Sequence, residues 1–96
     1  MKAYVIVRET ITDEAKFAEY RAQVLPTVEA FGGEFVIRGG HWTLVEGEWS
    51  RPRLVIIAFP SRAKAEDWYH SPAYQKLLPL RLQASQSDLI IADGIA

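Results

Sequence analysis

The stretch Leu54–Phe59 reads Leu-Val-Ile-Ile-Ala-Phe, and Pro60 follows it directly. An unbroken apolar run of this length, rich in β-branched residues and closed by a proline, predicts a central β-strand. Because successive side chains of a strand point to opposite faces of the sheet, this strand is apolar on both faces. The fold therefore has to cover both faces of the sheet that contains it.

Three further segments have strand character. Ala3–Val7 is short, β-branched and aromatic, and it also carries apolar side chains on both faces. Glu34–Arg38 predicts a second strand, after which Gly39-Gly40 allows a bend and His41–Val45 is expected to continue as extended chain. Asp88–Ala92 predicts the closing strand.

The two segments between these strands have helical character. Thr12 is expected to cap the first helix, whose apolar residues recur every three or four positions until Gly32-Gly33 ends it. Ser61 is expected to cap the second helix, and Ser71-Pro72 restarts it as a new N-cap and first turn.

The order strand, helix, strand, strand, helix, strand predicts an α+β fold of the ferredoxin-like βαββαβ type. With right-handed crossovers, both helices lie on one face of a four-stranded antiparallel sheet. A chain of 96 residues is expected to form a single domain over residues 1–96.

The second face of this sheet has no predicted element to cover it, although Tyr4 and Ile6 point toward it. Burying even about 400 Å² of apolar surface per subunit would contribute on the order of 10 kcal/mol. We therefore expect a homodimer whose sheets pair face to face, as a dimeric α+β barrel. The alternative is that Tyr4 and Ile6 form a tolerated surface patch.

The composition argues against several classes of protein. The formal net charge is −1 and basic residues are interspersed with acidic ones, so neither nucleic acid nor an anionic membrane is expected as a partner. No apolar run approaches the roughly 20 residues that cross a bilayer. Met1–Tyr4 lacks a signal-peptide pattern, so a cytoplasmic location is expected. With no cysteine and two histidines that lack metal-ligand spacing, we expect no metal, haem or other cofactor.

Several short segments occur together in a characteristic order and spacing. They are Phe31-Gly32-Gly33, Arg38-Gly39-Gly40, Val45-Glu46-Gly47-Glu48-Trp49, Phe59-Pro60-Ser61, Ala65, Trp68-Tyr69, Ser71-Pro72-Ala73-Tyr74 and Arg81. This combination resembles the bacterial domain of unknown function 1330 family, within the dimeric α+β barrel superfamily. The resemblance covers nearly the whole chain and implies two ferredoxin-like subunits that pair their sheets. The superfamily includes cofactor-independent monooxygenases, lactone isomerases, haem-dependent enzymes and ligand-binding regulators, so it constrains the fold far more than the function.

Arg81 is the first candidate for binding a small-molecule ligand. Helical spacing places it on the same face as Tyr74, so its guanidinium is expected on the packed side of the helix. There it could hold a carboxylate or enolate oxygen. The alternatives are a structural salt bridge or a side chain whose charged end reaches solvent. Arg38, beside Gly39-Gly40, is a second ligand-binding candidate, with an ordinary strand-end charge as the alternative.

His41 and Tyr69 are the candidate proton-transfer residues. A neutral imidazole can act as an acid or a base near pH 7, although a loop histidine packed on Trp42 explains His41 as well. Tyr69 and Tyr74 flank the Ser71-Pro72 restart and could orient a substrate oxygen, but such tyrosines are more often core residues with a tethered hydroxyl. Trp42 could line the ligand pocket.

Two functions remain open from the sequence. The first is a cofactor-independent enzyme acting on a small carboxylate- or enol-bearing molecule, with Arg81 or Arg38 holding the anion. The second is a non-catalytic ligand-binding or stress-related dimer. Convergence of Arg81, Tyr69 and His41 on one cavity would favour the enzyme, whereas a dry apolar cavity would favour the second function.

Overall fold

The computed structural model describes residues 1–95, which form four strands and three helices. In chain order these elements are β1 (Ala3–Ile11), α1 (Glu14–Glu29), β2 (Glu34–Arg38), β3 (Arg53–Phe59), α2 (Arg62–His70), α3 (Pro72–Ala84) and β4 (Ser85–Asp93).

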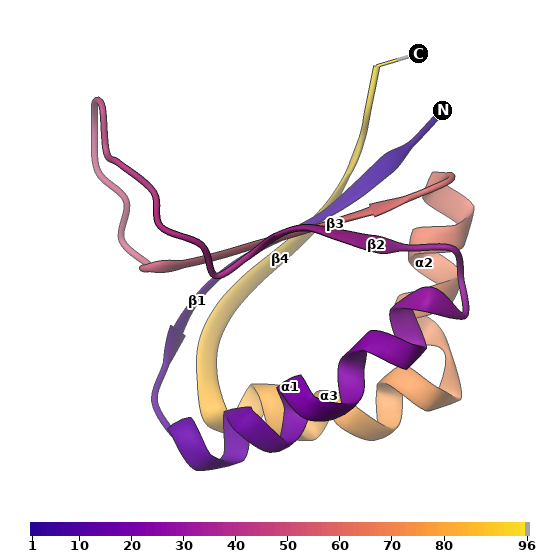
Figure 1. Ribbon diagram of the computed structural model, residues 1–96, viewed down its shortest axis with the longest axis horizontal. Coiled ribbons are helices and arrows are strands. Elements are labelled where there is room, and N and C mark those ends of the chain that lie inside the picture. The colour runs from indigo at the N-terminus through magenta and orange to yellow at the C-terminus, as the bar shows by residue number, and fades with distance from the viewer. Residues whose placement is uncertain (96) are drawn as a thin grey trace.

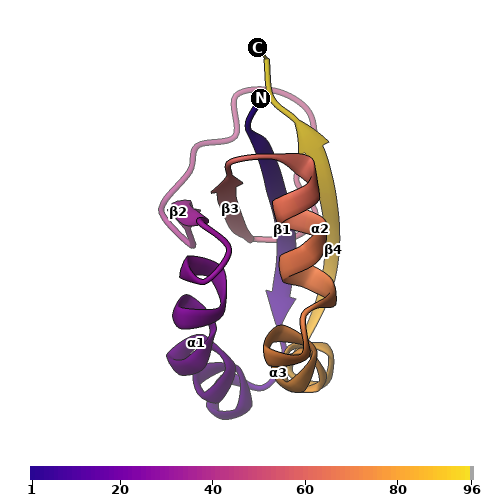
Figure 2. The ribbon, with the colours of Figure 1, turned by 90° about the vertical axis from the view of Figure 1, so that its right-hand side faces the viewer.

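The strands form one antiparallel sheet in the order β2-β3-β1-β4. The two central strands, β1 and β3, are those whose sequences are apolar on both faces. All three helices lie on one side of the sheet (Figure 1), with α1 toward the β2 edge and α2 toward the β4 edge (Figure 2). This arrangement is ferredoxin-like, so the predicted α+β fold class is confirmed.

The helical layer contains three helices where the sequence analysis expected two. Ser71 separates α2 from α3 in an extended conformation, with φ −65° and ψ 145°, because a residue that precedes proline avoids the helical region. Its side chain accepts a hydrogen bond from the backbone N–H of Tyr74 and caps α3, as predicted. Within residues 1–95, no helix has the length and apolar character needed to cross a membrane.

Three local predictions are wrong. Asp13, not Thr12, caps α1 by accepting from the backbone N–H of Lys16, while the backbone N–H of Thr12 donates to Ala84. β1 continues beyond Val7 because the polar residues that follow still pair with β3 and β4. Residues 41–45 form no strand, since Gly39 adopts a left-handed φ of 72° and turns the chain away from β3.

The core lies between the sheet and the helices and is centred on Trp68, which is 1% exposed. Its ring centroid lies 5.5 Å from that of Phe59 on β3 and 4.1 Å from that of Tyr74 on α3. Its indole N–H donates to Thr27 Oγ1 on α1 at 3.1 Å. A Cβ on Gly33 would come within 2.6 Å of the Phe59 ring, so only glycine allows the close approach of α1 and β3.

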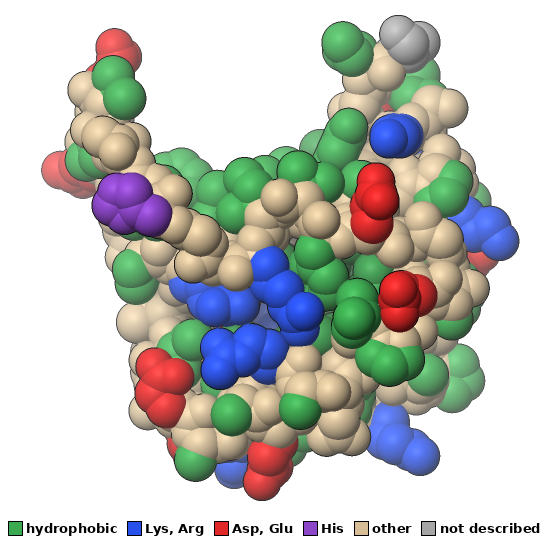
Figure 3. Space-filling view, viewed as in Figure 1, with side chains coloured by type: hydrophobic (Ala, Val, Ile, Leu, Met, Phe, Trp, Pro, Cys, Tyr) green, Lys and Arg blue, Asp and Glu red, His purple; other side chains and the backbone are tan. Residues whose placement is uncertain are grey.

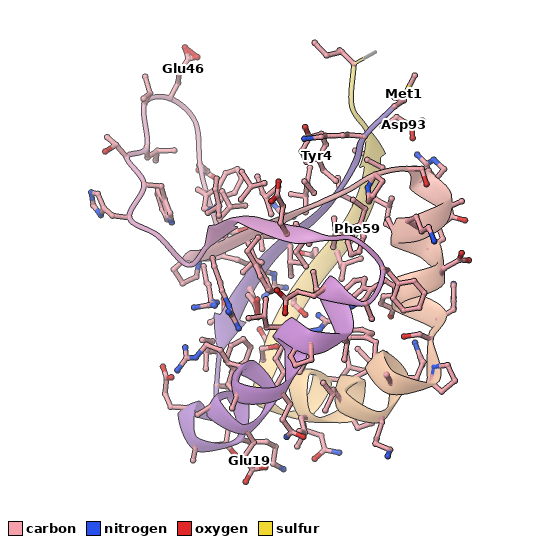
Figure 4. The ribbon with its side chains drawn as sticks, turned by 45° about the vertical axis from the view of Figure 1, so that its right-hand side comes forward. Met1, Tyr4, Glu19, Glu46, Phe59 and Asp93 are labelled. Carbon is pink, nitrogen blue, oxygen red and sulfur yellow. The ribbon has the colours of Figure 1, made fainter. Side chains whose placement is uncertain are left out.

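The opposite side of the sheet has no covering element within residues 1–95. We call this surface the open face; it is formed by Tyr4, Ile6 and Arg8 on β1, Leu54 and Ile56 on β3, and Asp88 and Ile90 on β4. Ile90 is 57% exposed, and Tyr4 lies on the side away from the helices (Figure 4). Figure 3 shows hydrophobic side chains lining a saddle along this edge of the molecule.

The loop of residues 39–52 stands out from the sheet beside the open face (Figure 1), with Glu46 at its tip (Figure 4). The indole N–H of Trp42 donates to the carbonyl of Pro52 at 2.6 Å and holds the two arms of the loop together. Arg51 anchors the base of the loop to β4, with its Nε 2.9 Å from Asp88 Oδ2. The loop is therefore fixed at its base and exposed at its tip.

Candidate functional site

A pocket lies between the sheet and the helices α1 and α3. Its apolar lining includes Val7, Phe17, Val24, Phe35, Val55, Ile57, Trp68 and Leu89. Its polar lining consists of Glu9, Tyr20, Arg21, Arg38, Arg53, Tyr74 and Arg81. The cavity volume is about 30 Å³, which is room for one or two water molecules or for the polar end of a small organic molecule.

The mouth of the pocket is strongly basic. Figure 3 shows Lys and Arg side chains gathered in a hollow on this face, below the sheet. Arg38 packs its guanidinium carbon 4.3 Å from the centroid of the Phe35 ring and donates from Nη2 to the carbonyl of Arg21. The guanidinium carbon of Arg53 lies 5.3 Å from the centroid of the Phe17 ring. Ring contacts of this kind orient the charges without neutralising them.

The position of the Arg53 guanidinium depends on the glycine at residue 39. Gly39 has a left-handed φ of 72°, and a Cβ at this position would overlap the guanidinium of Arg53. The Arg38-Gly39-Gly40 segment therefore does two things at once: it turns the chain out of β2 and leaves room for a second arginine beside Arg38.

Arg81 forms the inner wall and is 4% exposed. Its Nε donates to the Tyr74 hydroxyl at 3.2 Å, and its Nη1 donates to Ser87 Oγ at 2.6 Å. The Tyr74 and Tyr20 hydroxyl oxygens are 2.9 Å apart and share a further hydrogen bond. Within residues 1–95, no carboxylate lies within ion-pair distance of Arg81. A structural salt bridge, one of the alternatives drawn from the sequence, therefore does not hold this arginine.

Glu9 is the acidic residue of the pocket and is 2% exposed. Its Oε1 lies 3.8 Å from Arg53 Nε, an ion-pair distance that is too long for a hydrogen bond. Among the described residues, Glu9 Oε2 and Arg53 Nε are buried without any hydrogen-bond partner. Buried polar atoms of this kind are rare in folded proteins and call for an explanation.

Burial is the main influence on the ionisation of this pocket. It raises the pKa of the Glu9 carboxyl above its ordinary value, and the charges of Arg53 and Arg81 offset only part of the rise. Burial also raises the pKa of the Tyr20 and Tyr74 hydroxyls, which stay protonated at neutral pH. It lowers the pKa of Arg53. Glu9 is therefore the carboxyl of this pocket whose titration moves toward neutral pH.

The structure brings together only some of the residues that the sequence analysis selected. Arg38, Tyr74 and Arg81 line the same pocket. His41 is exposed in the loop of residues 39–52, and Trp42 packs there on Trp49, with 6.2 Å between ring centroids.

Tyr69 packs on the outer side of the aromatic core, with its ring centroid 5.6 Å from that of Tyr74, and does not line the pocket. Arg81, Tyr69 and His41 therefore do not converge on this pocket, so it gives no support to His41 or Tyr69 as its proton-transfer residues. Gly39 directs the loop away from the helices, and Trp68, not its neighbour Tyr69, faces inward.

Glu9, Tyr20 and Arg53 were not selected from the sequence as functional residues. A signal for Glu9 was available, because it shares the inward register of Ala3, Val5 and Val7, where an acid is unexpected. No comparable signal marked Arg53, since its place in the pocket depends on the pairing of β1 with β3, which sets it opposite Glu9.

The family described as domain of unknown function (DUF1330) matches residues 2–95 of the chain. The resemblance drawn from the short sequence segments is thereby confirmed. No curated protein matches the chain.

Several solved structures share this fold at low sequence identity. A protein of unknown function from Rhodopseudomonas palustris is 19% identical, with a TM-score of 0.78 over 99% of this chain and 83% of that one. A dimeric ferredoxin-like protein of unknown function from a Jannaschia species is 14% identical, with a TM-score of 0.75 over 98% and 100%. SnoaB, a cofactor-independent oxygenase from Streptomyces nogalater, is 16% identical, with a TM-score of 0.66 over 99% and 94%.

Proposed function

The chain belongs to the DUF1330 family, and we propose that its pocket binds a small organic anion on which the protein acts as a cofactor-independent enzyme. One observation carries this proposal: Arg21, Arg38, Arg53 and Arg81 line a single pocket in which Glu9 is the only acid among the described residues. Guanidinium groups keep their charge at physiological pH and bind carboxylate or enolate oxygens through paired hydrogen bonds. The pocket thus has an excess of positive charge that an anion would neutralise.

The arginines divide into two groups by depth. Arg21 and Arg38 are exposed at the mouth, where they can meet an incoming anion. Arg53 and Arg81 lie further in, beside Glu9 and the paired tyrosine hydroxyls. An anion held between these groups would have its charged end inside the pocket and its remainder toward the mouth.

Glu9 supports an enzymatic role for this pocket because its raised pKa suits a group that accepts and returns protons. For a substrate with a C–H bond next to a carbonyl, Glu9 would take the proton. The electron pair of the C–H bond would move to the carbonyl oxygen and form an enolate, which a guanidinium stabilises. The fold shared with SnoaB, described as a cofactor-independent oxygenase, is compatible with such chemistry.

Anion binding is tested by NMR titration with lactate as the probe. The wild-type protein is expected to bind lactate, and Arg38→Ala is expected to weaken binding by roughly tenfold because one of the positive charges that attract the anion is lost. Arg62→Ala is the matched control, since Arg62 pairs with Glu66 and Asp93 outside the pocket. Absence of binding, or an equal loss in the control, would contradict the proposal.

The catalytic part is tested by deuterium exchange of the pyruvate methyl group in D₂O, followed by ¹H NMR. Wild-type protein is expected to accelerate the exchange, because a proton accepted by Glu9 is replaced from solvent before it returns to carbon. Glu9→Gln is expected to reduce the rate to background. If the wild type binds lactate but exchanges the pyruvate methyl protons no faster than Glu9→Gln does, the protein binds anions without catalysis, and the proposed enzymatic role is contradicted.

We also propose that the open face is covered by a second copy of the chain. The exposed side chain of Ile90 and the half-buried apolar side chains of Ile6 and Ile56 on the neighbouring central strands support this assembly. A ferredoxin-like relative in fold is described as dimeric, which is consistent with it. Because the pocket lies on the helical side, the dimer would leave its mouth accessible.

A further inference from the structure

Two unpartnered polar atoms face the same pocket, and they are complementary. Glu9 Oε2 is a hydrogen-bond acceptor without a donor, and Arg53 Nε is a donor without an acceptor. They cannot satisfy each other, since the Arg53 Nε lies 3.8 Å from the nearer carboxylate oxygen, Oε1. Leaving such atoms unpaired costs roughly 1–3 kcal/mol each, more for charged groups.

The neighbouring groups do not supply the missing partners. On α3, Arg81 uses its Nε and Nη1 for Tyr74 and Ser87. Tyr20 on α1 is hydrogen-bonded to the Tyr74 hydroxyl. Ser87 on β4 lies opposite Glu9 in the sheet and accepts from Arg81, but its hydroxyl makes no hydrogen bond to Glu9 Oε2.

We propose that the ligand is a small carboxylate with a hydroxyl or enol O–H on the adjacent carbon, and that Glu9 selects for this O–H. The O–H would donate to Glu9 Oε2, and a carboxylate oxygen would accept from Arg53 Nε. This inference rests on the proposed anion site and specifies its substrate class: 2-hydroxy acids and the enol forms of 2-oxo acids.

Other small ligands satisfy only half of this arrangement. A plain carboxylate pairs with Arg53 but leaves Glu9 Oε2 without a donor and places a second negative charge beside it. A neutral alcohol pairs with Glu9 but leaves Arg53 without an acceptor. Sites that hydrogen-bond a substrate hydroxyl discriminate strongly against analogues that lack it, because a buried group is then left unpaired.

The size of the cavity fits this class. With room for one or two water molecules, a cavity of about 30 Å³ limits the inner site to the polar end of a small molecule. The remainder of a longer molecule would extend along Phe17 and Phe35 toward the mouth.

The test uses two matched pairs of probes, lactate with propionate and glycolate with acetate, each titrated by NMR at neutral pH. Each hydroxy acid is expected to bind wild-type protein at least about tenfold more tightly than its deoxy analogue. Glu9→Gln keeps the shape of the side chain but removes its charge and adds an N–H₂ donor. The plain carboxylates are therefore expected to gain affinity in this variant, and the preference for the hydroxy acids to disappear.

Glu19→Gln is the control, because Glu19 is exposed on the side of α1 away from the sheet (Figure 4) and does not line the pocket. The preference of this variant for hydroxy acids over their deoxy analogues is expected to equal that of the wild type. Equal binding of both members of each pair to wild-type protein would overturn this inference and leave the anion site intact. An unchanged preference in Glu9→Gln would also overturn it. Binding of none of the four acids would instead refute the anion site itself.

Discussion

The two faces of the sheet differ in the kind of side chain that each one buries or exposes. The helix-covered face buries charged groups, including Glu9 at 2% and Arg81 at 4% exposure. The open face exposes apolar groups, among them Ile90 at 57%. Both arrangements are costly in an isolated subunit, because buried charges lose hydration and exposed aliphatic side chains order water.

The difference supports the two proposals about where a ligand and a second subunit would bind. A buried, charged pocket is stabilised when a small polar ligand supplies the missing hydrogen bonds. An exposed apolar surface is stabilised when a protein surface of similar character covers it. We therefore assign the ligand to the helical face and the second subunit to the open face.

The largest expected effect comes from placing a charge on the open face. Ile90→Asp would bury a carboxylate in the proposed dimer interface, at a cost of several kcal/mol, so we expect dissociation to become easier by on the order of 100-fold or more. Since Ile90 is exposed in the single subunit, its fold should persist. Light scattering would measure the mass against the 10.9 kDa of one chain.

Leu82→Asp is the control for this comparison, because Leu82 is 59% exposed on α3, on the helical side. It is expected to leave the mass unchanged. A wild-type mass of one chain at micromolar concentration, or equal dissociation in both variants, would refute the assignment of the open face.

The next effect concerns the helical face. Arg81→Ala would leave the Tyr74 hydroxyl and Ser87 without their donor and Glu9 with one fewer neighbouring charge. We expect a loss of about 2–3 kcal/mol in the free energy of unfolding, measured by urea denaturation.

Arg81→Lys separates the charge of this side chain from its shape. It is expected to recover part of the stability because the charge remains, but to bind lactate more weakly because an ammonium cannot reproduce the paired hydrogen bonds to Tyr74 and Ser87 that fix the inner wall of the pocket. If Arg81→Lys keeps full affinity for lactate, the paired hydrogen bonds of Arg81 play no part in binding.

The smallest effect is a pH dependence of stability. Because the pKa of Glu9 is raised in the folded protein, the folded state holds a proton more tightly than the unfolded state. Glu9 therefore disfavours folding once the pH rises above the ordinary value near 4.5 and through the folded pKa. Glu9→Gln is expected to increase stability at pH 7, and the gain should fade below about pH 4.5. A gain that is the same in urea titrations at pH 4 and pH 7 would contradict the raised pKa.

Much of the fold could be predicted from local patterns. The apolar run Leu54–Phe59 marked a central strand, and Ser61 and Ser71 marked helix caps, because these signals depend on neighbouring residues alone. Thr12 and Asp13 both have side chains that can cap a helix, so the sequence did not distinguish them. In the structure the backbone N–H groups of both residues donate to the carbonyl of Ala84, and it is the Asp13 side chain that accepts from Lys16.

The site was predictable only in part. Helical periodicity placed Arg81 and Tyr74 inward, and the two glycines after Arg38 marked a bend beside the pocket. His41 was misplaced because its position depends on the direction of a loop that no local pattern specifies.

The sequence by itself determined the order of strands and helices, the two-sided apolar character of β1 and β3, and the inward direction of Arg81. These follow from the periods of strand and helix, which are properties of short segments. Only the tertiary structure decided that Glu9 and Arg53 face each other. Their meeting depends on the antiparallel register of two strands more than 40 residues apart, with Gly39 leaving room for the guanidinium. The chemistry of this pocket therefore arises from strand pairing, which joins residues that no local pattern connects.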